Sequence, residues 1–374
     1  MTQPFNMRFV TLEGTPRERG RIHGETLRSE ILELMERFRD DTRQECLHPL
    51  IERTGLLAAA EKWTPDLVEE VRGIGEGAGL DFKTIFAWQL VEEVGWLGEY
   101  EKTLGSDDLG SGGCSALGVF GEESRSTLLA QTADNGVSVD GYQTFLHVKC
   151  LGSSLEAFVL TYPGWVGVYG LNSRGIGVCL NTISRQMNYA PDGLPVLFVG
   201  RGILAQPTLS DAIKFVRGIK HASGENYVIG EPGRVIDYEC SANRVCQFIP
   251  YEGATRVYHT NHALVNDDVR LTARAMEKLP ADVQLQLGRA RQNSETRFRS
   301  LENWLRDTSE PVTVERVKSI LSSHDSPEYP ICRHKRPDNP GMTNACLIME
   351  CSTLPVMHVA SGPPCMTEFK SFRF

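Results

Sequence analysis

The chain has 374 residues, of which 41% are hydrophobic and 23% charged, a composition typical of a folded globular protein that buries a sizeable core. Its formal net charge of -9 argues against a nucleic-acid partner, because affinity for phosphate depends on clustered Lys and Arg. The N-terminal residues do not resemble a secretory signal, and no apolar run reaches the length of a bilayer span, so we expect a cytoplasmic protein with no membrane partner.

The first part of the chain, from Thr15 to about Leu104, has the apolar spacing of helices. Thr15 followed by Pro16 suits a helix start. The next helical stretch, PDLVEEVRGIGEGAGL, carries alternating glycines, but it lacks the preceding strand and the spacing of a dinucleotide-binding loop. We therefore expect a helix face of small residues that packs closely on a neighbouring element. A third helical stretch, TIFAWQLVEEVGWL, follows.

A polar glycine-rich loop, GSDDLGSGG, then leads directly into an apolar strand that begins at Cys114. Short β-rich runs dominate the rest of the chain, and one pair of them is predicted to form a hairpin with its turn at 172–175. Helical patterns interrupt these strands at LSDAIKFVRGI, SETRFRSLENWL and VERVKSILSS. Because strands and helices come in blocks and do not alternate singly, the predicted fold class is an α+β layered sandwich.

The junction between Gly113 and Cys114 could support self-cleavage. A cysteine thiol can attack the carbonyl carbon of the residue that precedes it in the chain, and water can then hydrolyse the resulting thioester. Gly110, Gly112 and Gly113 would give the loop the backbone freedom that this attack requires. The new α-amino group of Cys114, with an ordinary pKa of roughly 7.7–8.0, could then act as general base. A buried structural cysteine at the start of a strand is the alternative interpretation.

Several segments in chain order carry a resemblance to a known family: GTPRERGRIHGE, the glycine-cysteine junction, AQTAD, LNSRGIGVCLN, ECS, YHTNHAL, YPICR and GMTNACLIME. Together they resemble the acyl-coenzyme A:6-aminopenicillanic acid acyltransferase family of self-cleaving thiol enzymes, in the N-terminal-nucleophile hydrolase superfamily. The resemblance implies a four-layer αββα sandwich. It also implies a helical segment 1–113 and a β-rich catalytic segment 114–374, which stay associated after cleavage as one compact domain.

The resemblance also implies roles for individual residues. Cys114 matches the nucleophile, and Asp134, in AQTADN, matches the acidic residue that holds the nucleophile's amino group. Asn261, in HTNH, matches the asparagine whose amide donates to the oxyanion, a role that needs a neutral, fixed donor. Ser241 matches a serine near the acyl site, and Asn181 lies on a strand that the superfamily uses at its cleft. We expect both to contact substrate.

The substrate is expected to differ from that of the penicillin-forming member. Asn339 and Pro340 stand where that member has a substrate-facing Ser-Arg pair, and loss of the arginine removes a bidentate partner for a carboxylate or phosphate. Arginines elsewhere in the family match Arg333 and Arg297, and we include Arg333 among the substrate-binding candidates. Thr132, with the neighbouring Ala133, replaces larger side chains and would reshape the acyl pocket.

We expect neither a metal nor a cofactor. His259 and His262 flank Asn261 in an H-x-x-H arrangement, but neither an H-E-x-x-H helix nor a closely spaced third ligand accompanies them. They are expected to shape the loop. The ten cysteines are scattered, without a C-x-x-C pair, which favours reduced thiols.

The function predicted from these residues is hydrolysis of a small N-acyl amine or amino acid conjugate through a Cys114 thioester. Transfer of the acyl group from an acyl-coenzyme A thioester to an amine shares the first half-reaction and remains the alternative. A binding protein on the same fold would instead leave the chain uncleaved. A metallohydrolase would lose activity with chelators and survive Cys114→Ser. The sequence does not fix the oligomeric state and is compatible with a homo-oligomer.

Overall fold

The computed structural model describes residues 3–38, 48, 51–90, 92–93, 96, 113–120, 127–183, 186–270, 281–306, 311–336 and 341–374. Its helices are α1 (Pro16–Thr26), α2 (Arg28–Arg37), α4 (Leu56–Trp63), α5 (Pro65–Ala78), α6 (Phe82–Ala87), α8 (Val196–Leu204), α9 (Leu209–Gly218), α11 (Ala281–Leu305) and α12 (Val314–Leu321), with a short 3-10 turn at Val137–Val139. Its strands are β1 (Arg8–Gly14), β2 (Gly113–Val119), β3 (Thr127–Gly136), β4 (Thr144–Cys150), β5 (Glu156–Thr161), β6 (Tyr169–Asn172), β7 (Gly177–Thr182), β8 (Glu225–Glu231), β9 (Arg234–Cys240), β10 (Val245–Gln247), β11 (Arg256–His259), β12 (Gly341–Cys351), β13 (Val356–Ala360) and β14 (Phe369–Arg373).

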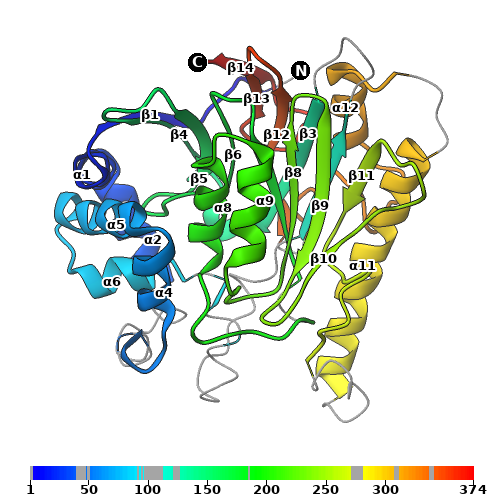
Figure 1. The fold of residues 1–374 in the computed structure, drawn as a ribbon. Coiled ribbons are helices and arrows are strands. Elements are labelled where there is room, and N and C mark those ends of the chain that lie inside the picture. The colour runs from blue at the N-terminus through cyan, green and yellow to red at the C-terminus, as the bar shows by residue number, and fades with distance from the viewer. Residues whose placement is uncertain are drawn as a thin grey trace.

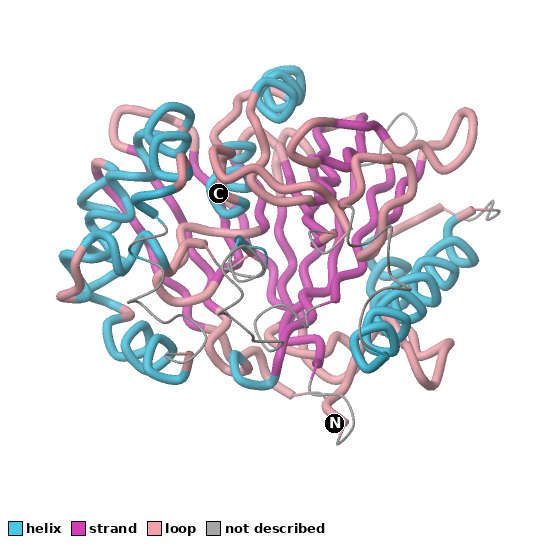
Figure 2. Tube along the Cα trace, turned by 90° about the horizontal axis from the view of Figure 1, so that it is seen from below, coloured by secondary structure: helices cyan, strands magenta, loops and turns pink. Residues whose placement is uncertain are grey.

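The strands form two sheets that pack face to face. One has eight strands in the order β1-β4-β5-β6-β7-β8-β9-β10, and the other has six in the order β11-β2-β3-β12-β13-β14. Strands β2 and β3 of the smaller sheet contact β7 and β8 of the larger one. Helices α8 and α9 contact the larger sheet, and α11 and α12 contact the smaller one, so the strands lie between two helical layers (Figures 1 and 2). The predicted αββα sandwich is confirmed.

The helices that precede β2 lie at the β1 end of the larger sheet (Figure 1). Strand β1 pairs in parallel with β4 over seven residue pairs, from Arg8 with Thr144 to Gly14 with Cys150. Buried Glu70 on α5 forms ion pairs with Arg19 on α1 and with Arg201 on α8, at 3.0 and 3.1 Å. The chain before Cys114 is therefore joined to the chain after it through both a sheet ladder and a buried charge cluster.

The glycine face predicted in the second helical stretch packs on α1. A Cβ atom on Gly73 would lie 2.1 Å from the Arg17 carbonyl oxygen, and one on Gly77 would lie 2.3 Å from that of Arg21. These distances leave no room for a side chain, so the two helix backbones are in direct contact. Gly79 has a different role: it ends α5 with a φ of 74°, in the left-handed region.

Two further sequence predictions can be compared with the structure. The helix start at Thr15 is confirmed, because Thr15 and Glu18 form a capping box. The predicted hairpin is also confirmed: β6 and β7 pair in antiparallel fashion, and the turn between them contains Gly175 at a φ of 81°.

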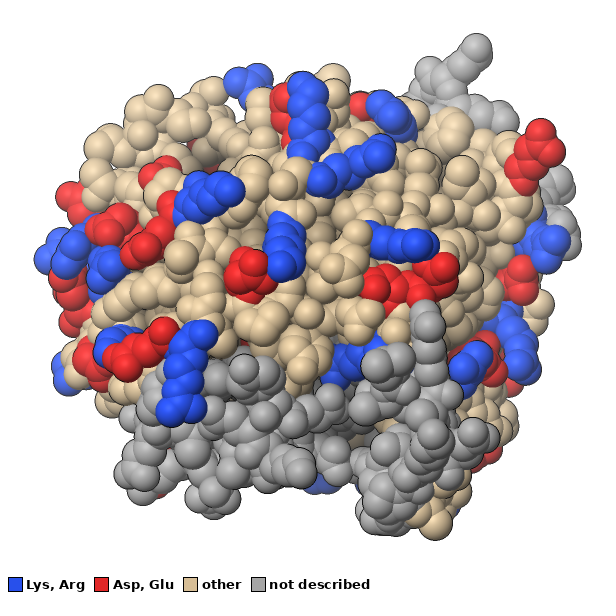
Figure 3. All heavy atoms as spheres, turned by 60° about the horizontal axis from the view of Figure 1, so that its bottom comes forward, with Lys and Arg blue, Asp and Glu red and all other residues tan. Residues whose placement is uncertain are grey.

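Two features of the described part concern membranes and nucleic acids. No described helix is both long and apolar enough to cross a bilayer. On the face shown in Figure 3, the described basic side chains are interspersed with acidic ones. That face therefore does not present a continuous basic surface for nucleic acid.

Candidate active site

Cys114 lies near the start of β2 and points toward the larger sheet. It pairs across the strands with Ala133 on β3, and its Sγ lies 3.8 Å from the Tyr169 hydroxyl oxygen on β6. Burial, together with the negative charge of Asp134, raises the pKa of the thiol to about 11. In the intact chain the thiol is therefore protonated at neutral pH, and it needs a base to become a nucleophile.

The backbone of Cys114 is held by side chains from three other elements. Its nitrogen donates to Asn261 Oδ1 at 2.8 Å. Its carbonyl oxygen accepts from Asn181 Nδ2 on β7 at 3.0 Å and from Arg297 Nη1 on α11 at 2.7 Å. This nitrogen is a peptide nitrogen here, and it would become the α-amine on cleavage. The structure thus brings together the predicted residues Cys114, Asn181 and Asn261.

Arg297 connects these groups. Besides the Cys114 carbonyl, its guanidinium donates to Ser115 Oγ at 3.0 Å, to Asn261 Oδ1 at 2.9 Å and to Asn293 Oδ1 at 2.7 Å. Burial lowers the pKa of Arg297 to about 10, against the attraction of Asp134, so the side chain remains charged at neutral pH. One buried cation therefore sets the position of both the candidate nucleophile and Asn261.

The orientation of the Asn261 amide follows from its neighbours. Cys114 N and Arg297 Nη2 are both donors, so the carbonyl oxygen Oδ1 must face them. The amide nitrogen donates to the Thr182 carbonyl at 3.1 Å, which occupies one of its two hydrogens. Its predicted donation to an oxyanion would have to use the second hydrogen, and this role stays a prediction.

Asp134 lies beside the Gly113–Cys114 junction. It pairs across the strands with Gly113, its Oδ1 accepts from Thr343 Oγ1 at 2.7 Å, and its Oδ2 lies 3.9 Å from Arg333 Nη1. Burial raises the pKa of the Asp134 carboxyl, and the charges of Arg333 and Arg297 oppose this shift. Asp134 Oδ2 is buried without a hydrogen-bond partner among the described residues. Its predicted bond to the nucleophile's amine also stays a prediction.

Two arginines enclose Gly113. A Cβ atom on this residue would lie 3.0 Å from both Arg297 Nη2 and Arg333 Nη1. Any larger residue at this position would push against guanidinium groups that are already hydrogen-bonded or paired. The predicted residue Arg333 therefore lies at the junction. Gly110 and Gly112 of the preceding loop fall outside the described residues.

The loop that carries Asn261 is held by Glu239 on β9. Buried His259 lies 2.9 Å from Glu239 through its Nε2 atom, and the carboxylate accepts from the backbone nitrogens of Leu264, Val265 and Asn266. Burial alone would raise the pKa of Glu239, but the bonds from His259 and the loop amides outweigh it and lower that pKa. Glu239 thereby fixes the loop in which Asn261 stands.

His259 and His262 do not share a metal-like site. His262 Nδ1 lies 2.8 Å from Ser294 Oγ on α11, whereas His259 pairs with Glu239. Ser294 Oγ also accepts from the Asn261 backbone nitrogen at 2.7 Å. The contacts of both histidines therefore agree with the expectation that they shape the loop.

The other predicted residues occupy different places. Thr132 is buried beside the junction, where its Oγ1 accepts from the Ser115 nitrogen at 3.2 Å. Ser241 follows β9, and its hydroxyl donates to Asp268 Oδ2 at 2.7 Å. It lines an open depression bounded by residues 217–221 and 241–245, and its described hydrogen bonds are not with residues of the Cys114 cluster. Asn339 and Pro340 lie outside the described residues.

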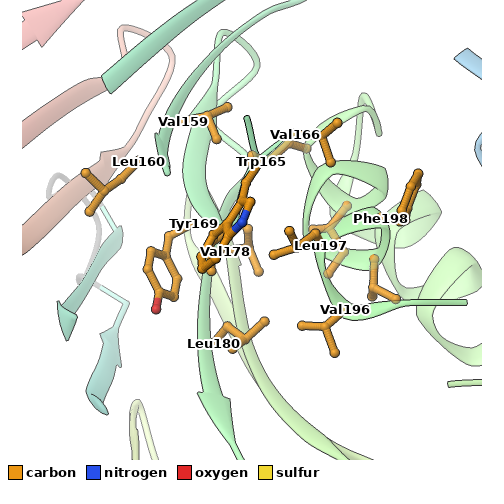
Figure 4. Packing of buried hydrophobic residues seen from close by; sticks show 14 of the residues in the cluster. Val159, Leu160, Trp165, Val166, Tyr169, Val178, Leu180, Val196, Leu197 and Phe198 are labelled. Atoms are coloured by element: carbon orange, nitrogen blue, oxygen red, sulfur yellow. The ribbon is translucent and has the colours of Figure 1, made fainter. Parts of the chain in front are cut away.

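A group of mainly apolar side chains packs beside the thiol, around Tyr169 and Ala133, and leaves no room for a water molecule. The group comes from strands of both sheets and from the loops next to them: Ala133, Gln143, Leu160, Thr161, Tyr162, Tyr169 and Ala345. Figure 4 shows Tyr169 and Leu160 on the side of the sheet away from the α8 residues Val196 to Phe198. Sequence analysis named Ala133 as a pocket residue but missed Tyr169, Glu239 and Ser294. Glu239 stands in the ECS segment that carries the resemblance, so this segment was an available signal for it.

Comparison with known proteins identifies the family. A family model described as acyl-coenzyme A:6-aminopenicillanic acid acyl-transferase matches residues 121–363, which is more than half of the chain and includes Asp134, Asn181 and Asn261. The 40 kDa form of acyl-coenzyme A:6-aminopenicillanic-acid-acyltransferase from Emericella nidulans is 26% identical over 282 residues, covering 70% of each chain.

Two solved structures are also similar. Penicillin V acylase from Agrobacterium tumefaciens has a TM-score of 0.38 and 12% identity, covering 66% of this chain and 83% of its own. A mutant form of conjugated bile acid hydrolase from Clostridium perfringens has a TM-score of 0.37 and 10% identity, covering 70% of this chain and 97% of its own. The extent of the family match is decisive: the chain belongs to the acyl-coenzyme A:6-aminopenicillanic acid acyl-transferase family.

Proposed function

We propose that this protein is a self-processing thiol amidohydrolase that uses Cys114 to cleave a small N-acyl amine or amino acid conjugate. The observation that carries the proposal is the placement of Cys114 itself. Its nitrogen contacts Asn261, its carbonyl oxygen contacts Asn181 and Arg297, and its sulfur contacts the Tyr169 hydroxyl. A structural cysteine would not need its backbone held by three polar side chains from distant elements.

Self-cleavage begins when Cys114 Sγ attacks the Gly113 carbonyl carbon. The C–N bond breaks as the acyl chain moves to sulfur, and the nitrogen takes the proton that the thiol gave up. Water then hydrolyses the thioester, which leaves a carboxylate on Gly113 and a free amine on Cys114. The two arginines beside Gly113 place positive charge next to the residue whose carbonyl oxygen becomes negative during the attack.

The released α-amine then serves as the base in turnover. It takes the thiol proton as Sγ attacks the substrate's acyl carbon, and it returns that proton to the departing amine. Buried Asp134 Oδ2, which has no hydrogen-bond partner among the described residues, provides an acceptor for the new ammonium group. The side chains packed around Tyr169 are mainly apolar, which favours an apolar acyl group, and they must move apart to admit it. No cofactor enters these steps.

Acyl transfer is the second candidate, and the name of the Emericella nidulans relative, an acyltransferase, favours it. It would use the same Cys114 thioester, with an amine in place of water as the second nucleophile. We favour hydrolysis because water needs no acceptor site of its own.

Self-cleavage can be tested by denaturing mass spectrometry of the purified protein. We expect two fragments, 1–113 and 114–374, which co-elute in gel filtration. The Cys114→Ala variant should give one chain of 41.6 kDa. The matched control is Cys150→Ala, because Cys150 is a half-buried free cysteine on β4, and this variant should still be cut. An intact wild-type chain after prolonged incubation would rule out the mechanism.

Activity can be tested on the processed protein with a panel of N-acyl amines, and separately with acyl thioesters plus amine acceptors. Release of free acid from the amides, with none from Cys114→Ala, supports hydrolysis. If product forms only when thioester and amine are supplied together, acyl transfer replaces hydrolysis as the function. A processed chain that turns over none of the panel would favour a binding protein.

A further inference from the structure

Outside the Cys114 cluster, four metal-ligating side chains converge from three separate segments of the chain. His324 follows α12, Cys332 and His334 precede β12, and Cys365 lies between β13 and β14. One ligand atom from each lies within 4.8 Å of all the others. Among the described residues, this is the one group of three or more potential metal ligands that lie this close together.

The separations fit a single tetrahedral ion. His324 Nε2 and His334 Nε2 are 2.9 Å apart, and His334 Nε2 lies 3.9 Å from Cys332 Sγ and 3.3 Å from Cys365 Sγ. With zinc bond lengths of about 2.0–2.1 Å to nitrogen and about 2.3 Å to sulfur, the edges of a tetrahedron span roughly 3.3–3.8 Å. Shifts of a few tenths of an ångström in the side chains would therefore complete the coordination.

The ligand types favour zinc. Two thiolates and two neutral imidazoles balance the charge of a divalent ion, and sulfur and nitrogen donors in a tetrahedron are the preferred surroundings of Zn²⁺. The two rings are nearly parallel, at an interplanar angle of 16°, with their Nε2 atoms directed at each other. We propose that His324, Cys332, His334 and Cys365 bind one zinc ion in a closed, structural site.

This proposal replaces the expectation that the protein binds no metal. The sequence analysis considered only His259 and His262, which stand close together in the chain. The four ligands proposed here are spread over 42 positions, from 324 to 365, and they do not form a local zinc-binding motif. Only the pairing of β12 with β13 and of β13 with β14 brings Cys365 near the other three.

The ion would hold Arg333, which stands between two of its ligands. The Arg333 nitrogen donates to Thr343 Oγ1 on β12 at 2.9 Å, and the Arg333 carbonyl oxygen accepts from the Thr343 nitrogen at 3.1 Å. The Arg333 guanidinium lies beside Gly113 and Asp134. The Cys332 nitrogen donates to the Ser323 carbonyl at 3.1 Å, next to His324. With all four positions filled by protein, the ion would not activate water. It would instead fasten the loop that presents Arg333 to the self-cleavage junction.

The test is metal analysis of the full-length protein, kept reduced, loaded with zinc chloride and desalted. We expect about one zinc per chain. Cys365→Ser and His324→Ala should each lower zinc content at least tenfold. The matched control is Cys246→Ser, because Cys246 is a partly exposed free cysteine on β10, and it should retain the ion. Cobalt should give the visible absorption of a tetrahedral thiolate complex, and this absorption should be absent in Cys365→Ser.

Failure of this proposal is distinguishable from failure of the proposed function. Cys114→Ala should bind zinc as wild type does, because none of the four ligands belongs to the Cys114 cluster. Substoichiometric zinc in reduced, folded wild-type protein would overturn the proposal. So would a stoichiometric metal that remains in Cys365→Ser. Peptide mapping that finds a Cys332–Cys365 disulfide, combined with no zinc uptake after reduction, would show that the two thiols form a redox pair instead.

Discussion

Replacing Arg297 by lysine would keep the buried charge but remove the guanidinium geometry. The guanidinium makes four hydrogen bonds, to Cys114 O, Ser115 Oγ, Asn261 Oδ1 and Asn293 Oδ1. A lysine ammonium at the end of a flexible stem can satisfy about two of these acceptors at once. Hydrogen bonds to charged groups contribute about 1.5–3 kcal/mol each. Loss of two should therefore lower the free energy of unfolding by about 3–6 kcal/mol, a large part of the roughly 5–15 kcal/mol typical of folded proteins.

The assay is denaturant unfolding followed by tryptophan fluorescence, in the Cys114→Ala background so that every chain is intact. Arg299→Lys is the matched control, because Arg299 lies on the same helix with a side chain that is 70% exposed, and it should change stability by no more than about 0.5 kcal/mol. In the Cys114 background, Arg297→Lys should also slow self-cleavage. If Arg297→Lys and Arg299→Lys unfold within about 1 kcal/mol of each other, the hydrogen-bond argument is wrong.

Three further predictions concern other features. Because the pKa of the Cys114 thiol is raised to about 11, the thiolate fraction rises about tenfold per pH unit at neutral to mildly alkaline pH. The rate of self-cleavage of freshly translated chain should rise in the same proportion, and a rate that levels off below about pH 8 would contradict this expectation. In calorimetric unfolding, Gly73→Ala should destabilise the protein by about 1–3 kcal/mol, since its Cβ would lie 2.1 Å from a carbonyl oxygen. Gly288→Ala, at an exposed position of α11 where a Cβ meets nothing within 4 Å, should be neutral or stabilising, and equal losses in the two variants would refute the packing argument. Burial raises the pKa of Glu93 from 4.5 to about 8. The contribution of neutral Glu93 to the free energy of unfolding is therefore complete below pH 4.5 and is lost as the pH rises to about 8. Glu93→Gln should flatten the plot of unfolding free energy against pH in this range, and parallel plots for wild type and variant would contradict the prediction.

Local signals in the sequence predicted much of the fold. The Thr15–Pro16 start and the hairpin turn near Gly175 succeeded because their geometry depends on neighbouring residues. Strand β1 was missed because its partner, β4, lies more than 130 positions later in the chain. Helix α8 was missed for another reason: all nine of its residues are buried, so it lacks the polar face that marks an amphipathic helix.

The site was predictable only in part. Cys114, Asn181 and Asn261 were named from the resemblance, and the structure brings them together. Arg297 was noted as a family arginine, but its position across both Cys114 and Asn261 depends on how α11 packs against β2 and β11. Ser241 was also named from the resemblance, but its described hydrogen bonds do not join it to the Cys114 cluster. A matching segment does not by itself determine which way a loop side chain points. The hydroxyl of Ser241 is bonded to Asp268.

The parallel pairing of β1 with β4 has a consequence for the order of folding and maturation. In the uncut chain these strands meet in an intramolecular reaction, whose rate does not depend on protein concentration. In the processed enzyme that we propose, they belong to two separate polypeptides, so renaturation would require a bimolecular encounter. Chains that have already matured should therefore recover poorly from dilute denaturant, whereas Cys114→Ala chains should recover well, and the cut would act as a one-way step that commits each molecule to a single folding event.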